Sequence, residues 1–305
     1  MARTETLNGS ARAEKIGNGS AQAEPSTRRR RLRAFRLPVL VLVLLGATAL
    51  FAAINQLVAP IPMLALPVGI GLAVACVAGY RRLSQVVELR ADVPEVAPDG
   101  ARSALFRGAV LGSCLFTTVM VFIAIFGGWQ SLTWGSIGGL TASAGAMVAV
   151  ATIEEVLFRG VVFRIVEERA GTVLALVMST VLFGLLHLVN PHASLLGALA
   201  ISLTGGLLTA AAYVATRSLW LPIGVHFAWN TVSGGVFGVV VSGAETAPGS
   251  LLHTTLSGPS LITGGTFGPE ASLFTLLVCL VPIVVLLRRA ARTGQIRRRP
   301  GRAAA

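Results

Sequence analysis

Apolar runs long enough to cross a lipid bilayer recur along most of this chain, and they constrain its fold more than any other feature. A membrane-spanning helix needs about 20 consecutive apolar residues, and its backbone hydrogen bonds must be satisfied internally because hydrocarbon offers no partners. The sequence therefore predicts an all-α fold, a polytopic membrane helical bundle of about eight transmembrane helices. The eight runs lie at residues 37–58, 61–80, 105–127, 137–163, 172–189, 194–214, 219–241 and 271–287.

The composition argues against a soluble globular domain. Only 12% of the 305 residues are charged, against roughly 25% in typical soluble domains, and the mean hydropathy is +0.76. Each of the three cysteines lies inside an apolar run, without the spacing of a redox or metal motif. Neither a disulfide nor a metal site is therefore predicted for Cys76, Cys114 and Cys279.

The basic residues indicate the topology. The 25 Lys and Arg residues contribute to a net charge of +12, but they flank the apolar runs and are not interleaved with aromatic side chains, so no nucleic-acid partner is predicted. With eight spans, all of these residues fall in the two terminal segments or in regions on the same side of the membrane. Because basic segments stay in the cytoplasm, the sequence predicts a multi-pass cell-membrane protein with both termini cytoplasmic.

Polar segments divide the chain. Residues 1–36 are rich in Ala, Gly, Ser and Arg, which predicts a disordered basic cytoplasmic tail. Residues 291–305 are also basic and are predicted to form a second cytoplasmic tail. The transmembrane helical domain is expected at residues 37–290. Within that domain, residues 88–104 and 242–270 are predicted to be polar loops.

Two adjacent carboxylates and a guanidinium interrupt the fourth apolar run, as Glu154, Glu155 and Arg159. A charge near the centre of a membrane helix costs about 2.5–3.5 kcal/mol on insertion scales, so such residues usually mark functional sites. Arg159 lies four residues after Glu155 on the same helical face, where a bidentate contact is within reach. That pairing would leave Glu154 free for chemistry. The alternative interpretation is a helix that leaves the membrane here with three solvated charges at its end.

Two histidines also lie inside apolar runs. His187 ends the sequence Phe183-Gly-Leu-Leu-His187, and His226 precedes Asn230 by four residues, so the latter two share a helical face. If the fourth and fifth spans are antiparallel, Glu154 and His187 stand level in the membrane at ~1.5 Å rise per residue. A lone histidine in a membrane helix is often explained by a hydrogen bond between helices. Polar groups on three separate spans favour a shared site instead.

These polar groups form three motifs that resemble those of a known family. The motifs are Glu-Glu-x-x-x-Arg at residues 154–159, Phe-x-x-x-His at residues 183–187 and His-x-x-x-Asn at residues 226–230. In this order they resemble the motifs of the CPBP family, which comprises CAAX prenyl endopeptidases and bacterial Abi or bacteriocin-processing homologues. The resemblance covers about residues 105–290, the expected core of the transmembrane domain, and no motif residue is substituted.

The resemblance implies an intramembrane endopeptidase of the CAAX protease/Abi type that uses an activated water and no acyl-enzyme. Glu154 would act as the general base, and His187 would share the proton of the water. His226 and Asn230 would donate hydrogen bonds to the developing oxyanion, a contribution of about 2.7–4 kcal/mol per donor. These four residues are the predicted catalytic set.

Three further residues are assigned supporting roles. Glu155 and Arg159 are expected to hold Glu154 in place, and Phe183 belongs to the second motif. No serine or cysteine beside a histidine stands out as a nucleophile.

A zinc mechanism is the alternative to this metal-free one. Glu154, His187 and His226 would then supply the His2Glu ligand set of a catalytic zinc site. The sequence contains no His-Glu-x-x-His helix, and the metal-free glutamate mechanism is the preferred interpretation.

Two functions other than proteolysis remain compatible with the sequence. A transporter would also keep charges near the bilayer midplane, but the two halves of the chain show no inverted repeat. A non-catalytic membrane scaffold or immunity protein would retain the fold and its motifs without turnover. As a protease, the protein is expected to have as partners the lipid bilayer and a peptide or protein substrate, membrane-associated or lipidated.

Overall fold

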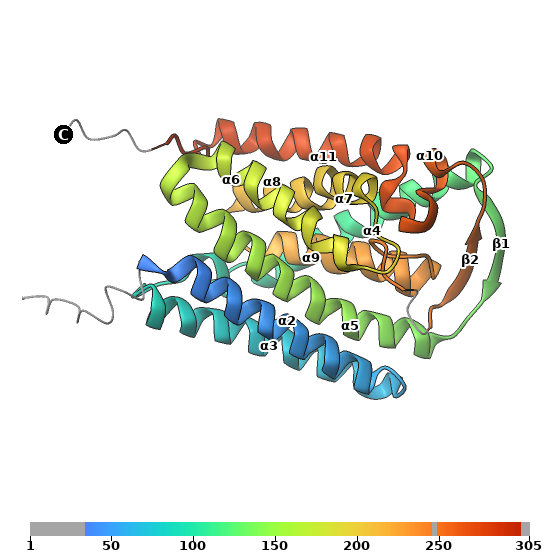
Figure 1. The fold of residues 1–305 in the computed structure, drawn as a ribbon, viewed down its shortest axis with the longest axis horizontal. Helices are drawn as coiled ribbons and strands as arrows, with labels where there is room; N and C mark the ends of the chain where they lie inside the picture. Colours follow the sequence, from blue (N-terminus) through green and yellow to red (C-terminus); the bar gives the residue numbers. More distant parts are fainter. Residues whose placement is uncertain (1–33, 246–248, 300–305) are drawn as a thin grey trace, which may run out of the picture.

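The structure, a computed structural model, describes residues 34–245 and 249–299. The predicted tail at residues 1–36 lies almost entirely outside these described residues. The all-α, polytopic fold is confirmed, since the helices lie side by side in one bundle (Figure 1). The helices are α2 (Arg36–Val58), α3 (Pro62–Val87), α4 (Ala101–Ile125), α5 (Ile137–Glu155), α6 (Arg164–Leu186), α7 (Leu195–Ile201), α8 (Leu207–Thr216), α9 (Trp220–Asn230), α10 (Ser260–Thr263) and α11 (Leu273–Arg292).

Six helices in the described part of the chain are long and apolar enough to cross a membrane, where eight spans were predicted. The longest of the six, Ile137–Val189, joins two predicted runs. Within it, Gly171 has a φ of +81° and breaks the helix, and the chain reverses direction there (Figure 1). The predicted run at 219–241 forms the shorter α9 and a π-helical segment, η5 (Thr231–Phe237), and is not among the six. The count of eight therefore stays a prediction.

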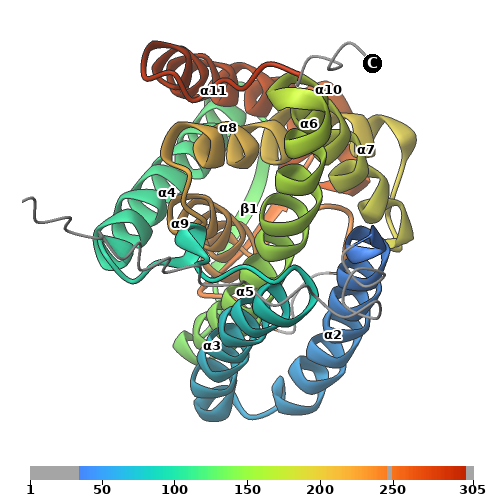
Figure 2. The same ribbon diagram turned by 90° about the vertical axis from the view of Figure 1, so that its left-hand side faces the viewer.

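Glycine contacts bring the helices of the candidate site against their neighbours. Gly108 on α4 and Gly224 on α9 pack so closely that a Cβ atom at either position would overlap a backbone oxygen of the other helix. Gly145 on α5 meets the backbone of α3 at Ala65 in the same way. In a membrane, small residues allow this close approach, and packing drives association. Figure 2 shows α9 beside α4, and α5 beside α3.

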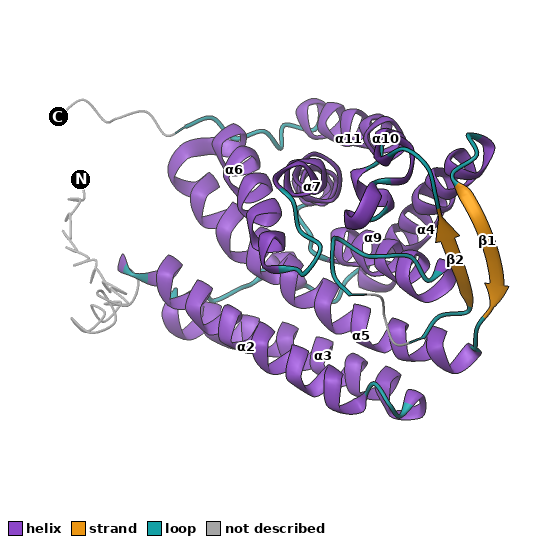
Figure 3. Cartoon of the chain, turned by 45° about the vertical axis from the view of Figure 1, so that its right-hand side comes forward, coloured by secondary structure: helices purple, strands orange, loops and turns teal. Residues whose placement is uncertain are grey.

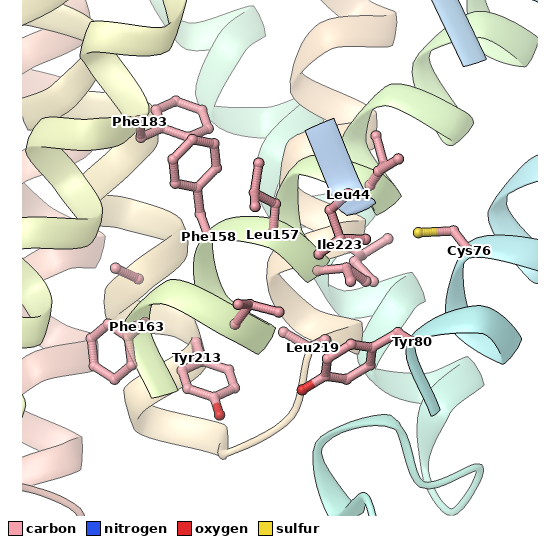
Figure 4. Close-up of a cluster of buried hydrophobic side chains, with 14 of the residues drawn as sticks. Leu44, Cys76, Tyr80, Leu157, Phe158, Phe163, Phe183, Tyr213, Leu219 and Ile223 are labelled. Carbon is pink, nitrogen blue, oxygen red and sulfur yellow. The ribbon is translucent and has the colours of Figure 1, made fainter. Parts of the chain in front are cut away.

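The buried apolar core surrounds the π-helical segment η2 (Val156–Phe163), which continues α5. Every residue of η2 is buried. Figure 4 shows Phe158 turned toward Phe183 and Phe163 near Tyr213; these aromatic pairs have ring centroids 5.2 and 5.4 Å apart in edge-to-face geometry. The segment that follows Glu155 is thus fixed inside the bundle rather than leaving the membrane.

Two short antiparallel strands, which the sequence did not predict, lie at one end of the bundle (Figure 3). They are β1 (Trp129–Trp134) and β2 (Leu252–Leu256), with Trp134 paired to Leu252. The region also contains the short helix α10 and a 3-10 turn, η7 (Pro269–Ala271). The prediction of a plain loop at residues 242–270 was therefore wrong, because strand pairing and short helices satisfy its backbone.

Residues 88–104, predicted to be a polar loop, contain a buried carboxylate that is held by other segments. Glu88 exposes only 2% of its surface. Its carboxylate accepts hydrogen bonds from Arg164 at 2.5 Å and from Arg36 at 3.2 Å. Arg36, which was assigned to the N-terminal tail, is instead the first residue of α2, because this buried carboxylate binds its guanidinium.

A second buried carboxylate of the same segment belongs to Glu95. Arg90 donates to both of its oxygens, at 2.6 and 2.7 Å, and the Tyr80 hydroxyl lies 2.5 Å from one of them. Burial alone would raise the pKa of Glu95, but the hydrogen bonds from Arg90 and Tyr80 outweigh it and hold the pKa below its ordinary value. The hydrogen bond from Tyr80 on α3 therefore holds this segment against α3.

The C-terminal segment is also bound to the helices in its described part. Helix α11 continues to Arg292, into the predicted tail at 291–305. The backbone of Arg297 then exchanges hydrogen bonds with Thr172 on α6, at 2.8 and 3.0 Å. Arg217 between α8 and α9 donates to the side chain of Gln295 at 3.1 Å. Residues 295–297 thus connect α6 with the α8–α9 turn.

Candidate functional site

Glu154 and His226 face each other across a narrow gap inside the bundle. Glu154 lies at the C-terminal end of α5 and His226 lies on α9, and 3.9 Å separates Glu154 Oε2 from His226 Nε2. Among the described residues, Glu154 Oε2 has no hydrogen-bond partner although it is buried. The gap is too long for a direct hydrogen bond.

Glu155 connects this pair to Arg159. Its Oε1 atom accepts a hydrogen bond from Arg159 Nη1 at 3.0 Å and lies 2.8 Å from His226 Nδ1. An ionised carboxylate only accepts hydrogen bonds, so Nδ1 carries the proton of this contact. His226 Nε2 then faces Glu154 as an acceptor in the neutral ring and as a donor in the imidazolium. The role of Glu155 and Arg159 in holding Glu154 stays a prediction; the contact that Glu155 makes is with His226, which faces Glu154.

Arg159 is fully buried, with 0% of its surface exposed. Its second guanidinium nitrogen donates to the carbonyl oxygen of Gly206 at 2.6 Å, so the contact with Glu155 is single rather than bidentate. The guanidinium also lies 4.8 Å from the centre of the Phe183 ring, within the range of a cation–π interaction. These contacts exclude the alternative of solvated charges at a helix end.

Phe183 brings the second motif to the other two. Its ring centre lies 4.8 Å from that of His187 and 5.9 Å from that of His226. His187 Nδ1 lies 2.8 Å from the carbonyl oxygen of Phe183. A carbonyl only accepts, so Nδ1 is the protonated nitrogen, and Nε2 of a neutral His187 is left as an acceptor. The supporting residue Phe183 therefore contacts both histidines of the predicted catalytic set.

Asn230 follows His226 by one turn, and both residues line a small cavity to whose wall neither Glu154 nor His187 contributes. The cavity has a volume of about 20 Å³, enough for roughly one water molecule. Phe183 and Ser242 are also in its wall. Asn230 is buried, and the structure gives its side-chain amide no hydrogen-bond partner among the described residues. The amide is thus available to a bound molecule.

Glu270, in η7, also borders this cavity and was missed by the sequence analysis. Its Oε1 atom accepts from Trp229 Nε1 at 2.8 Å, and its Oε2 atom accepts from the Ser242 hydroxyl at 2.7 Å and from the Ser242 backbone. Trp229 immediately precedes Asn230, so Glu270 ties the segment after α9 to the helix of the third motif. No motif or spacing in the sequence indicates a role for Glu270, because it lies at the end of the predicted polar loop at residues 242–270.

π-helical turns begin next to two of the motifs. The segment η2 starts directly after Glu155, and η5 starts directly after Asn230. Such turns are rare and often occur at functional sites, because they change the direction of side chains on an otherwise regular helix. Neither turn has a recognised signal in the sequence.

The zinc alternative can be compared with this arrangement. In the described part of the chain, no group of three or more His, Cys, Asp or Glu side chains is placed to hold a metal ion. The conditional ligand set Glu154, His187 and His226 is thus not assembled as a zinc site here. No step is therefore derived through a metal.

The fold and these contacts define a class of protein, a polytopic membrane protein with a buried carboxylate–histidine site. The particular family follows from a comparison with known proteins. The family model described as type II CAAX prenyl endopeptidase Rce1-like matches residues 135–232, which contain all three motifs. The match agrees with the family predicted from the three motifs and, over residues 135–232, supports a CAAX-type intramembrane protease at the level of the family. No curated protein and no solved structure matches the chain.

Proposed function

We propose that the protein is an intramembrane endopeptidase in which Glu154 activates a water molecule for attack on a peptide bond. The observation that carries this proposal is the 3.9 Å separation between Glu154 Oε2 and His226 Nε2, at a buried carboxylate oxygen without another partner among the described residues. One water bridging these atoms would be desolvated and oriented by both.

The reaction requires two proton transfers at Glu154. The carboxylate removes a proton from the water as its oxygen attacks the carbonyl carbon of the scissile bond. The protonated Glu154 then returns this proton to the amide nitrogen as the carbon–nitrogen bond breaks, so a carboxylic acid and an amine are released. His187 Nε2 would accept a hydrogen bond from the second proton of the water and so orient it.

The oxyanion that forms in this reaction would be stabilised by His226 and Asn230. Glu155 accepts the Nδ1 proton of His226, and the imidazolium form of the ring has an Nε2 proton to donate. The Asn230 amide, one turn along the same helix, supplies a second donor without taking part in proton transfer. In a dry site such donors act on the transition state more strongly than on the substrate.

A trapping experiment with Glu154→Gln tests the proposal. The full-length variant, which retains the shape of the site, should capture a peptide or protein that the wild-type protein cleaves. Cleavage of the captured substrate should be lost in Glu154→Gln and retained in Arg82→Gln, a change at an exposed residue remote from the site. Cleavage by Glu154→Gln at the wild-type rate would refute the assignment of the base.

Hydroxylamine separates attack by water from an acyl-enzyme mechanism. A direct attack yields only the free carboxylate product, whereas an acyl-enzyme would be intercepted by hydroxylamine as a hydroxamate. We expect no hydroxamate, and its formation would contradict the proposed chemistry.

A separate measurement tests the zinc alternative. Metal analysis of purified wild-type and His226→Ala protein should show no zinc that depends on His226. Stoichiometric zinc in the wild type that is lost in His226→Ala would instead assign His226 as a ligand.

A further inference from the structure

A second cavity, distinct from the candidate site, lies between α3 and α4. Its volume is about 360 Å³, which is within the range of sites for small molecules. Its walls are mostly apolar side chains, among them Val74 and Ala78 of α3, Leu105 of α4 and Ile223 of α9. Figure 2 shows α3 and α4 apart, with α5 and α9 between them. We call this cavity the α3–α4 groove.

The α3–α4 groove and the candidate site use different faces of α5. Val148 and Thr152, one helical turn apart, line the groove. Glu154 follows Thr152 by two residues, which corresponds to a rotation of about 200° around an α-helix. The Thr152 hydroxyl donates to the carbonyl oxygen of Val148 at 2.7 Å, so it offers no free donor to an occupant of the groove. An apolar chain in this groove would lie on the far side of α5 from Glu154.

A single charged residue lines the groove. Arg81 on α3 is exposed and forms no ion pair with a described residue, whereas the nearby Arg90 and Arg164 bind buried carboxylates. Trp220 also lines the groove and donates to the carbonyl oxygen of Ala97 at 2.7 Å. Arg and Trp together are typical of the level at which lipid headgroups meet the hydrocarbon.

We propose that the α3–α4 groove binds an anionic glycerophospholipid, with one acyl chain in the groove and the phosphate on Arg81. The apolar walls match a hydrocarbon chain, and the free guanidinium matches a phosphate at the end of that chain. Basic pockets between transmembrane helices bind anionic headgroups in this way. The bilayer that surrounds the protein supplies the ligand directly to a groove on the outside of the bundle.

Two matched pairs of variants test the proposal on the full-length protein in a neutral detergent. Arg81→Gln removes the phosphate contact, and Arg82→Gln removes another exposed charge that does not line the groove. Ala78→Trp fills the groove, and Ala75→Trp adds the same bulk at an exposed position of α3 outside it. Native mass spectrometry measures binding of phosphatidylglycerol and of phosphatidylcholine with identical chains.

We expect the wild type and both control variants to bind phosphatidylglycerol more tightly than phosphatidylcholine. Arg81→Gln should weaken binding of phosphatidylglycerol by about fivefold, the effect expected of one basic residue near a headgroup, and weaken binding of phosphatidylcholine less, because its choline group offsets the charge of its phosphate. Ala78→Trp should lose both lipids. Because Arg81 is exposed, its variant tests the proposal even if Ala78→Trp fails to fold.

Equal affinity of the wild-type protein for the two lipids would overturn the proposal. So would identical lipid binding by Ala78→Trp and Ala75→Trp. A third contrary result is a farnesylated peptide that binds the wild type but not Ala78→Trp while binding of phosphatidylglycerol is the same in both, because the groove would then be a substrate site.

Discussion

Replacing Glu155 with alanine removes a carboxylate whose Oε1 atom contacts both Arg159 and His226. Arg159 is 0% exposed, so the variant leaves a buried guanidinium without its counter-charge. The hydrogen bond to the Gly206 carbonyl and the contact with the Phe183 ring persist, but neither neutralises the charge. We therefore expect Glu155→Ala to lower both the stability and the activity of the protein.

The size of the stability loss follows from the burial of the pair. Removing one partner of a buried ion pair costs about 3–5 kcal/mol, a large share of the roughly 5–15 kcal/mol that stabilises a typical folded protein. The ratio of folded to unfolded protein should fall by about two to four orders of magnitude. Glu154→Ala is the matched control, because Glu154 Oε2 has no hydrogen-bond partner among the described residues. This control should abolish activity with little loss of folded protein.

A double variant separates the two roles of Glu155. In Glu155→Leu/Arg159→Met the whole ion pair is replaced by apolar side chains, a change that is often neutral or stabilising by about 1–4 kcal/mol. Folded protein should therefore recover. Activity should not recover, because His226 Nδ1 no longer has the acceptor that fixes the orientation of its ring.

The assay combines thermal melting of detergent-purified protein with cleavage of a substrate that the wild type cleaves. Equal melting temperatures of Glu155→Ala and Glu154→Ala would refute the predicted loss of stability. A double variant as unstable as Glu155→Ala would exclude the unpaired guanidinium as the cause. Full activity in the double variant would show that Glu155 does not act through His226.

Three further predictions test other parts of the structure. Loss of the Asn230 amide in Asn230→Ala should reduce the rate constant of cleavage by about 10²–10³ and leave KM nearly unchanged; an unchanged rate constant would remove Asn230 from the oxyanion site. On a background without native cysteines, a cysteine at the exposed Ser257 should react with an impermeant reagent added outside cells, and one at the exposed Thr293 should not. Labelling at Thr293 would contradict the proposed orientation. Because the folded pKa of Glu95 lies below the value of 4.5 for a free side chain, its stabilising contribution is present above about pH 4.5 and is lost as the pH falls through the folded pKa. The melting temperatures of wild type and Glu95→Gln should therefore converge as the pH falls from 6 to 3, and a constant difference would refute this.

Contacts within one helix could be predicted from spacing. Arg159 meets Glu155 because four residues return a side chain to the same face. The same rule relates His226 to Asn230, and both residues line one cavity. The apolar runs also predicted where the long helices lie, because hydrocarbon leaves a chain few other conformations.

Contacts between distant segments could not be predicted. The contact of Glu155 with His226 depends on how α5 and α9 pack, and glycine positions such as Gly145 and Gly224 determine that packing through close backbone approach. The polar segment with Glu88 looked solvated because its partner, Arg164, lies far along the chain. The polar composition of a segment does not show whether its charged side chains are exposed to solvent or paired inside the protein.

The π-helical segments explain why the directions of side chains could not be predicted from the sequence. A π turn bonds residue i to i+5, so each extra residue rotates all later side chains by about 100° relative to an α-helix. Backbone carbonyls in these segments, and in a third π-helical segment, η4 (Ser202–Gly206), are bound from other elements. The Ser179 hydroxyl binds Phe158 at 3.1 Å, Arg159 binds Gly206 at 2.6 Å, and the backbone of Leu251 binds Gly235 at 2.7 Å. Since buried carbonyls need such partners, the turns are stabilised by residues that a helical wheel does not contain. The directions in which side chains point after each π turn therefore depend on contacts made in the assembled bundle.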